Sequence, residues 1–458
     1  MKTNKIQNKV NGNYSKPSSF LSVNPLLITT KGRQKDDKRM SDKQDYVGKC
    51  VPSLRFPEFR NSEQWYAYQL SDISTPVIKK VGKIALTPVS ITAGIGFVSQ
   101  MEKFGQDISG SQYRNYIILC KGDFAYNKGN SLKFPQGCIY RLKEFDKVAA
   151  PNAFICFRIK QKYVADFYTG YFEKNYHGLQ LRKYITSGAR SNGLLNINDA
   201  SFFSITLPTP LDRDEQKKIA QCLASINTQI RQQQKQIDVL KQHKKALLQQ
   251  LFPQRGQSTP LLRYFIGSKK KWNYVEMRKV AILRTKRNVN NSKKVMTNSA
   301  NYGIIMQQDY FERNIVDNDH LQKYYIVENG DFVYNSRISV TAPVGPISKN
   351  YLATGVISPL YMVFRFNIDK DDFYVYYFQS EHWQVQLKRI ANNGARFDRM
   401  SISPSDFFNI KIPVPSAEER EYISKLFISI DNLINNMQQK VDLLMLQKKG
   451  LLQKLFPN

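Results

Sequence analysis

The chain has 458 residues, too many for one compact core, and predicts two or three domains. With 41% apolar and 12% aromatic residues it can bury real cores, which excludes a wholly disordered protein. Lysine and arginine exceed aspartate and glutamate by 68 − 37 = 31, and this positive charge favours a polyanion such as nucleic acid over a merely solvated basic surface.

Residues 1–45 are rich in lysine, asparagine and serine and are predicted to form a disordered basic tail. Such a tail is compatible with an arm that lies on DNA and with a loose terminus. Both interpretations stay open.

Residues 46–210 mix strand and helix signals and predict a globular domain of α/β (α+β) class. YIILCKGDFAYN at 116–127 has the form of a β-hairpin, with a glycine at the turn. Phe154–Ile159 suits a buried strand, and Asp166–Tyr184 has apolar residues at helical intervals. Its tyrosines and phenylalanines favour a core over a base-stacking platform.

Residues 211–253 predict a long coiled-coil helix. Asp212-x-x-Glu215 has the form of a capping box, and a final Leu-Phe-Pro stops the helix. A sustained 4-3 spacing of apolar residues predicts a coiled-coil seam. The apolar members of this first seam are Ile219, Leu223, Ile226, Ile230, Ile237, Leu240, Leu247 and Leu251.

The same pattern then occurs a second time. After a linker at 254–271, a second globular domain spans 272–413 and a second helix 414–458. YYIVENGDFVYN at 324–335 repeats the first segment at an offset of 208, and the later matches keep their order. Its seam consists of Ile423, Phe427, Ile430, Ile434, Val441, Leu444, Leu451 and Leu455.

The two seams predict an antiparallel coiled coil within one chain, in a fold with pseudo-two-fold internal symmetry. Ile219 to Leu251 would span about 48 Å, compared with ~34–36 Å for one turn of B-DNA, so the coil has the length of a ruler between two DNA-reading domains. Gln233, Lys244 and Lys448 place polar groups on the seams. They can specify register or form a docking face for a partner protein, and both interpretations remain open.

Several chemistries have no sequence signal. The chain has no phosphate-binding loop, no methyltransferase Asn-Pro-Pro-Tyr segment, no HExxH and no nucleophile elbow, which indicates a non-catalytic binding protein. The five cysteines form no CxxC pair and the four histidines are scattered, so we expect no metal site, free thiols and a cytoplasmic setting. No apolar run approaches the roughly 20 residues of a membrane span.

At these residues the chain resembles the specificity (S) subunit of type I restriction–modification enzymes. The likeness covers about 46–457 and rests on the duplication, Leu54-Arg-Phe-Pro-Glu-Phe59 with Trp65, the Gly-Asp-Phe-x-Tyr-Asn segments, and the two Leu-Phe-Pro ends. The resemblance implies two target-recognition domains that each bind half of a bipartite double-stranded DNA site. It also implies an antiparallel coil that fixes the gap and docks two modification (methyltransferase) subunits.

The resemblance further implies that restriction (translocase–nuclease) subunits join through the modification subunits. S-adenosylmethionine, ATP and Mg²⁺ would act in these partner chains, with no cofactor in this one. One departure is that the second helix begins Glu-Glu-Arg-Glu where the first has Asp-Glu-Gln-Lys.

Base-reading residues are expected where the two copies diverge, because the two domains would bind different half-sites. Arg190 and Arg396, shared after Gly-Ala, fit phosphate contacts or structural arginines, and both roles stay open. Lys128 and Arg337 lie just beyond the predicted hairpins. The remaining DNA-binding candidates lie in the divergent loops 100–114 and 307–318, and are Gln100, Lys103, Gln112, Arg114, Gln307, Gln308 and Arg313.

The sequence therefore predicts a sequence-specific DNA-binding subunit without catalytic activity of its own. A non-catalytic scaffold for RNA or another polyanion is the alternative. Steep salt dependence would fit both, whereas a base-specific footprint fits only the first.

Overall fold

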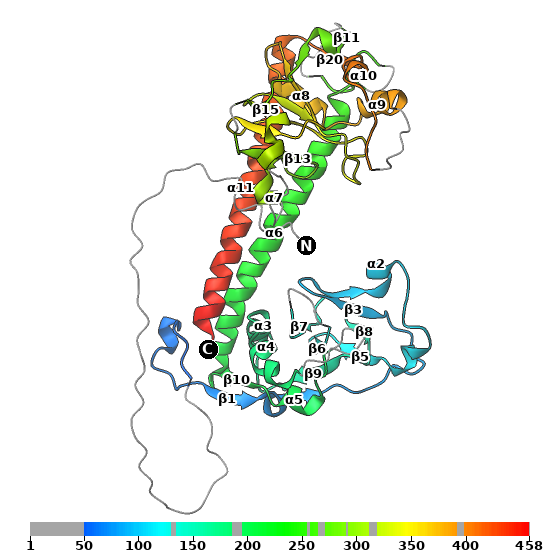
Figure 1. The fold of residues 1–458 in the computed structure, drawn as a ribbon. Helices are drawn as coiled ribbons and strands as arrows, with labels where there is room; N and C mark the ends of the chain where they lie inside the picture. Colours follow the sequence, from blue (N-terminus) through cyan, green and yellow to red (C-terminus); the bar gives the residue numbers. More distant parts are fainter. Residues whose placement is uncertain are drawn as a thin grey trace, which may run out of the picture. The chain divides into compact units, whose positions relative to one another are not determined.

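The computed structural model describes the chain in eight stretches, and the predicted tail at 1–45 lies outside them. These are residues 50–129, 134–185, 195–253, 257–263, 271–289, 292–310, 318–391 and 398–457. The described chain divides into two compact units. The first unit contains described residues between 50 and 235 together with 438–457, and the second contains those between 236 and 437. Each unit holds one sheet-bearing globular domain and a stretch of both long helices (Figure 1).

Both predicted long helices are present, as α6 (Arg213–Gln250) and α11 (Ala417–Leu455). Every predicted seam residue is buried or half-buried. In the first unit the beginning of α6 shares a core with the end of α11, and in the second unit the end of α6 shares one with the beginning of α11. The two helices are therefore antiparallel within each unit, and the predicted fold class is confirmed.

The first globular domain is built on a four-stranded sheet. Its order is β2 (Ser74–Pro76), β9 (Ile155–Ile159), β6 (Phe124–Asn127) and β7 (Cys138–Arg141), all antiparallel. Three two-stranded pairs complete it: β3 (Val89–Thr92) with β4 (Gly96–Ser99), β5 (Ile117–Cys120) with β8 (Lys147–Ala150), and β1 (Tyr66–Gln69) with β10 (Thr206–Thr209). The β1–β10 pair joins the two ends of the domain immediately before α6.

The second globular domain repeats this plan. Its corresponding sheet is β12 (Ala281–Leu283), β19 (Met362–Phe366), β16 (Phe332–Tyr334) and β17 (Ile347–Lys349). A further sheet has the order β14 (Gly303–Met306), β13 (Val295–Ser299), β18 (Gly355–Ile357) and β15 (Tyr325–Val327). The pair β11 (Asn273–Glu276) and β20 (Lys411–Val414) closes the domain.

The predicted hairpins at 116–127 and 324–335 are wrong, although the turns are present. Gly122 and Gly330 do adopt positive φ, at 97° and 88°. The strands that flank each glycine then separate, because β5 pairs with β8 while β6 pairs with β7 and β9. The second copy separates in the same way, with β15 on β18 and β16 between β17 and β19.

The buried strand predicted at 154–159 is present as β9, and its copy in the second domain is β19. The predicted helical stretches are broken in two, into α3 (Ala165–Glu173) and α4 (Tyr176–Leu181), and into α8 (Asp372–Tyr377) and α9 (Gln384–Ile390). In the first copy the break occurs at Asn175, whose φ is 59°. The remaining short helices are α1 (Leu70–Ile73), α2 (Gln100–Phe104), α5 (Asp199–Phe203), α7 (Gln307–Tyr310) and α10 (Pro404–Phe408).

The two Leu-Phe-Pro ends do more than stop the helices, because each completes the core of the other copy's domain. The Phe456 ring, at the end of α11, lies 4.5 Å from that of Tyr171 in the first domain. The Phe252 ring, after α6, lies 5.3 Å from that of Phe373 in the second domain. Both phenylalanines are almost completely buried.

Candidate nucleic-acid interface

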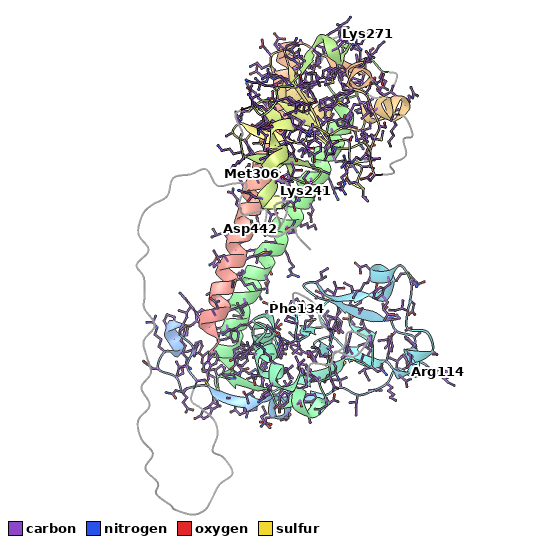
Figure 2. The ribbon with its side chains drawn as sticks, viewed as in Figure 1. Arg114, Phe134, Lys241, Lys271, Met306 and Asp442 are labelled. Atoms are coloured by element: carbon purple, nitrogen blue, oxygen red, sulfur yellow. The ribbon has the colours of Figure 1, made fainter. Side chains whose placement is uncertain are left out.

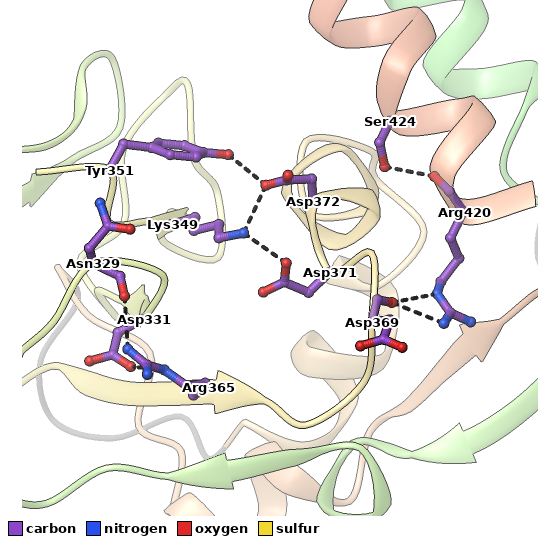
Figure 3. Close-up of polar contacts among 10 residues, drawn as sticks. All are labelled: Asn329, Asp331, Lys349, Tyr351, Arg365, Asp369, Asp371, Asp372, Arg420 and Ser424. Carbon is purple, nitrogen blue, oxygen red and sulfur yellow. Dashed lines mark hydrogen bonds and ion pairs between the residues drawn. The ribbon is translucent and has the colours of Figure 1, made fainter. Parts of the chain in front are cut away.

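The aspartate of each Gly-Asp-Phe segment is a structural residue. The buried Asp123 accepts the Cys120 backbone N–H at 2.8 Å and two hydrogen bonds from Arg158, at 2.6 and 2.9 Å. These bonds raise the pKa of Arg158. Asp331 repeats the arrangement with Arg365 at 2.7 Å (Figure 3), and burial raises the pKa of its carboxyl group. The shared aspartates therefore fix the turn and are not free to contact DNA.

The residues after β6 form a frame that holds a loop in the first domain. The Tyr126 hydroxyl donates to the Gln136 carbonyl oxygen at 2.8 Å, and Gly129 N–H donates to Asn127 Oδ1 at 2.9 Å. Gly137 closes the loop with φ of 78°, and a side chain there would collide with the Asn127 backbone oxygen. The loop's two ends are therefore pinned together.

The second domain has the same frame at an offset of 208. The Tyr334 hydroxyl donates to the Val344 carbonyl oxygen at 2.8 Å, and Arg337 N–H donates to Asn335 Oδ1 at 3.0 Å. Gly345 closes this loop, with φ of 84° and the same backbone contact to Asn335.

We call residues 128–136 and 336–344 the framed loops. They have equal length and different sequences: KGNSLKFPQ in the first copy and SRISVTAPV in the second. A shared frame that carries divergent side chains is the arrangement expected of two domains that recognise different ligands of one class. Residues 130–133 of the first framed loop lie outside the described residues.

A pair of basic residues follows the first strand of the main sheet in both domains, and the sequence analysis missed it. Lys79 and Lys80 come after β2, and Lys286 and Arg287 come after β12, all four with exposed side chains. The segments occupy equivalent places: Lys79 O accepts Ile118 N–H and Lys286 O accepts Ile326 N–H, both at 2.8 Å. The recurrence of two adjacent basic residues at an offset of 207 is the sequence signal that could have found them.

Further basic side chains lie beside each pair. Gly82 N–H donates to the Arg114 carbonyl oxygen at 3.1 Å, which brings exposed Lys83 and Arg114 close to the first pair. Figure 2 shows Arg114 directed outward at the margin of the first domain. In the second domain Arg287 donates to the Lys323 carbonyl oxygen and lies 4.7 Å over the Tyr325 ring. These basic side chains are exposed, and backbone hydrogen bonds fix the segments that carry them. Such an arrangement suits contacts to DNA phosphates.

The predicted base-reading residues of the first domain differ in exposure. Gln100 is 1% exposed. Its side-chain amide donates to Val89 O and Tyr116 Oη and accepts the Ile108 N–H, so its polar atoms are engaged within the domain and do not fit base reading. Lys103 donates to Ser90 Oγ and Ile91 O, and burial lowers its pKa. Gln112 and Arg114 are exposed on the 3₁₀ segment Gly110–Asn115, and Lys128 is half-buried.

The candidates of the second domain lie on two surface segments. Gln307 is half-buried and Gln308 exposed on α7, and Arg337 is exposed in the second framed loop. Arg190, Arg313 and Arg396 lie outside the described residues.

Each long helix is tied to its own domain by a buried carboxylate that the sequence had suggested as part of a capping box. Asp212 does cap α6, accepting Asp214 N–H at 2.7 Å. Glu215 instead accepts two hydrogen bonds from Arg55, both of 2.7 Å, and one from the Trp65 indole at 3.2 Å. The capping-box prediction is therefore correct for the aspartate and wrong for the glutamate.

The second copy repeats this clamp. Glu419 accepts two hydrogen bonds from Arg263, at 3.0 and 2.9 Å, while its N–H donates to the Ser416 hydroxyl at 3.3 Å. Arg420, where the first copy has Gln216, donates to the carbonyl oxygen of Pro415. It also donates to the carbonyl oxygen of Asp369, as Figure 3 shows.

Gln216 occupies the equivalent position with the same local role. It accepts Val164 N–H at 2.8 Å and donates to Pro210 O at 2.9 Å. The Gln216-to-Arg420 difference therefore preserves the attachment between helix and domain.

The polar seam residues have different surroundings in the two units. Lys244 Nζ lies 2.6 Å from Asp431 Oδ1 on α11, and Lys448 Nζ lies 2.6 Å from Glu173 Oε2 on α3. Gln233 is half-buried. The two lysines are equivalent in sequence but have non-equivalent partners.

Within the described residues, no group of three or more histidine, cysteine, aspartate or glutamate side chains is placed to hold a metal ion. The five cysteines are free. No helix in the described part of the chain is both long and apolar enough to span a membrane.

This architecture has similar proteins among those already known. Residues 269–444 match the family model of the type I restriction modification DNA specificity domain. The fold resembles that of the type I restriction–modification S subunit from M. genitalium, at 12% identity and a TM-score of 0.51 over 89% of this chain and 99% of that one. The fold of this chain is therefore that of the S subunit, and its second half carries the match to the DNA specificity domain.

Two curated relatives come from Methanocaldococcus jannaschii. The MjaVIII specificity subunit is 24% identical over 60% of this chain and 67% of its own length. The putative MjaX specificity subunit is 26% identical over 82% of this chain and 85% of its own length. The expected resemblance to type I restriction–modification specificity subunits is therefore confirmed by the family model over residues 269–444 and by both relatives.

Proposed function

We propose that this chain is the sequence-specific DNA-binding subunit of a type I restriction–modification complex, with each globular domain binding one half of a bipartite double-stranded site. The observation that carries the proposal is the pair of framed loops, which combine one scaffold with two sequences. The exposed dibasic segments of the same two domains supply phosphate contacts that hold the DNA in register without reading its sequence.

The coiled-coil helices have two further roles in this proposal: they set the number of base pairs between the half-sites, and they dock two modification subunits. The pairing of each domain with stretches of both helices supports a coupling between coil length and DNA spacing. Restriction subunits join through the modification subunits, and S-adenosylmethionine, ATP and Mg²⁺ serve those partner chains. The complex acts in the cytoplasm.

The direct test is to map methylated bases genome-wide in cells with and without this chain. The expected result is one bipartite motif with a gap of fixed length and variable sequence, present only with the chain. A footprint of the chain reconstituted with a modification subunit should cover the same two half-sites. Equal binding to all duplexes at every salt concentration would refute sequence recognition and favour a polyanion scaffold.

The role of the coil is tested by insertion. Adding one helical turn to both α6 and α11 should lengthen the preferred gap, whereas a gap that stays unchanged would refute the spacing role. The isolated chain should neither cleave nor methylate DNA, and either activity would contradict its assignment as a recognition subunit.

A further inference from the structure

The second framed loop carries an exposed aliphatic side chain at its middle position. Val340 is 102% exposed. A single exposed aliphatic residue needs no explanation by itself. Here, however, the residue is held on a rigid turn, surrounded by polar groups, in the part of the domain where the two copies diverge.

The turn that carries Val340 is pinned on both sides. Ser339 N–H donates to Ala342 O at 3.0 Å, and Ala342 N–H donates back to Ser339 O at 3.2 Å and to Ser339 Oγ at 3.1 Å. Below the turn, Ile338 N–H donates to Asp398 O at 2.9 Å. Valine is also stiff about χ1, so little conformational freedom remains to be lost when its methyl groups meet a ligand.

The neighbours of Val340 are hydrogen-bonding and cationic groups. The Thr341 hydroxyl donates to Asn301 Oδ1 at 3.2 Å, and Ser339 and Thr341 hydroxyls lie 3.3 Å apart. Arg337, three residues before Val340, is exposed. One aliphatic group among hydroxyls, an amide and a guanidinium suits a DNA groove better than a protein-docking surface, whose centre is apolar.

The same sheet connects this turn to the dibasic segment of the second domain. Asn301 lies in the turn between β13 and β14, and Arg287 forms a backbone bridge to Tyr325 on β15. The sheet order is β14, β13, β18, β15, so the two features lie at opposite edges of one sheet. A phosphate contact at one edge can therefore hold the duplex while the turn at the other edge meets base edges.

We propose that Val340 is a specificity residue that recognises a thymine through its 5-methyl group in the major groove. Thymine is the base that presents a methyl group there, and apolar side chains contact it. The inference rests on the proposed function. In the first copy the equivalent position is Leu132, also aliphatic in sequence, although it lies outside the described residues.

The test removes the methyl group from the DNA and the valine from the protein. Once the site is mapped, duplexes with deoxyuridine in place of each thymine, on either strand and in both half-sites, are bound to the full chain with its modification subunit. At one position the wild-type complex should bind deoxyuridine about fourfold more weakly, the effect of one buried methyl group. Val340→Ser should bind thymine and deoxyuridine equally there.

Val385→Ala is the matched control, because Val385 is an exposed valine on α9 of the same unit. It should keep the preference for thymine. A preference that persists in Val340→Ser, or no cost for deoxyuridine at any position, would overturn the proposal. The proposal would also be overturned if Val340→Ser bound the modification subunit more weakly while its preference for thymine over deoxyuridine stayed unchanged. That result would identify Val340 as a contact to the modification subunit. If the wild-type complex protected no bipartite site, the proposed function itself would be refuted. The footprint of the unmodified DNA shows this before any thymine is replaced.

Discussion

The two globular domains share their frame and differ at their margins. Both have the aspartate-held turn, the tyrosine–asparagine–glycine frame and the arginine–glutamate clamp at the start of the long helix. In the second domain β13 pairs in parallel with β18 to make a four-stranded sheet, whereas the first has a single parallel bridge, between Pro88 and Ala149. Duplicated residues thus maintain the loop supports and helix attachments, while sequence change is concentrated in the supported loops.

The contact between domain and helices differs as well. In the first unit Gly170 lets the Phe456 ring approach so closely that a side chain there would collide with it. In the second unit the equivalent residue is Tyr376, which stacks on Phe427 at 4.8 Å and donates to Asp431 at 3.2 Å. The same attachment is therefore made by close backbone approach in one unit, and by an aromatic stack with a hydrogen bond in the other.

The largest expected effect comes from breaking the exchanged phenylalanine contacts. Phe456→Ala should lower the stability of the first unit, and Phe252→Ala that of the second, each by about 3–5 kcal/mol because a buried ring leaves a cavity. Hydrogen exchange followed peptide by peptide separates the two units. Phe104→Ala, at an exposed position of the first domain, is the control. If Phe456→Ala lowered hydrogen-exchange protection in the second unit, or Phe252→Ala in the first, the assignment of each phenylalanine to the core of the other copy's domain would be contradicted.

The clamp should rank next. Glu215→Gln leaves a buried guanidinium without its countercharge and should destabilise the first unit by about 3 kcal/mol. Glu419→Gln should cost less, because Glu215 also accepts the Trp65 indole N–H, whereas among the described residues Glu419 accepts its side-chain hydrogen bonds from Arg263. Thermal unfolding measures both. Glu421→Gln, at a surface ion pair with Lys425, should change little. A larger loss for Glu419→Gln would reverse the proposed ranking.

A third difference should appear on acidification. Burial lowers the pKa of His177 to about 4, whereas the equivalent residue in the second domain is Trp383, which does not titrate. The unfolded chain takes up a proton near pH 6.5, so the stability contributed by neutral His177 is full above that pH and is lost as pH falls toward 4. At pH 5 the loss is about 2 kcal/mol.

His177→Phe keeps an aromatic ring against Tyr126 and Phe172 but removes the titration. Stability of the first unit, measured by hydrogen exchange between pH 7 and pH 5, should fall less in the variant than in the wild type. If stability fell equally with pH in the variant and in the wild type, His177 would be protonated inside the folded domain.

The smallest effects are expected from the dibasic segments. Lys79→Ala with Lys80→Ala, or Lys286→Ala with Arg287→Ala, should weaken specific and random duplexes alike, without changing sequence preference. The dependence of log binding constant on log salt should become shallower by about 2 for each double variant, since each phosphate contact contributes about 0.9. Lys388→Ala, on α9, is the control. If a double variant changed the preferred bases, these residues would contact bases and not only phosphates.

The parts of the fold that sequence predicted well are those with local periodicity or internal repetition. The 4-3 spacing of the seams reports a buried helix face directly, and the duplication implies two domains of one plan. The hairpin predictions were wrong because a glycine at a turn does not determine which partner each of the two flanking strands pairs with. The capping prediction for Glu215 was wrong for a similar reason, since its hydrogen-bond partner Arg55 is 160 residues away in the sequence.

The candidate site was predictable only in outline. Divergence between the copies pointed to loops 100–114 and 307–318, but Gln100 shows that a divergent polar residue can be buried. The framed loops were indicated only by Lys128 and Arg337, which follow the predicted hairpins. Exposure is set by packing that no local pattern records. The dibasic pairs could have been found by comparing the copies position by position.

The place of Phe456 has a consequence for synthesis of the chain. The first domain leaves the ribosome before the second, yet Leu452, Leu455 and Phe456 of its core are made only after the whole second domain. A nascent chain therefore carries an incomplete first domain until α11 has been made, which departs from the usual order in which domains finish folding in the order of their synthesis. A prematurely terminated product would have its defect at the opposite end of the sequence from the break, so a damaged message would yield chains with an impaired first domain.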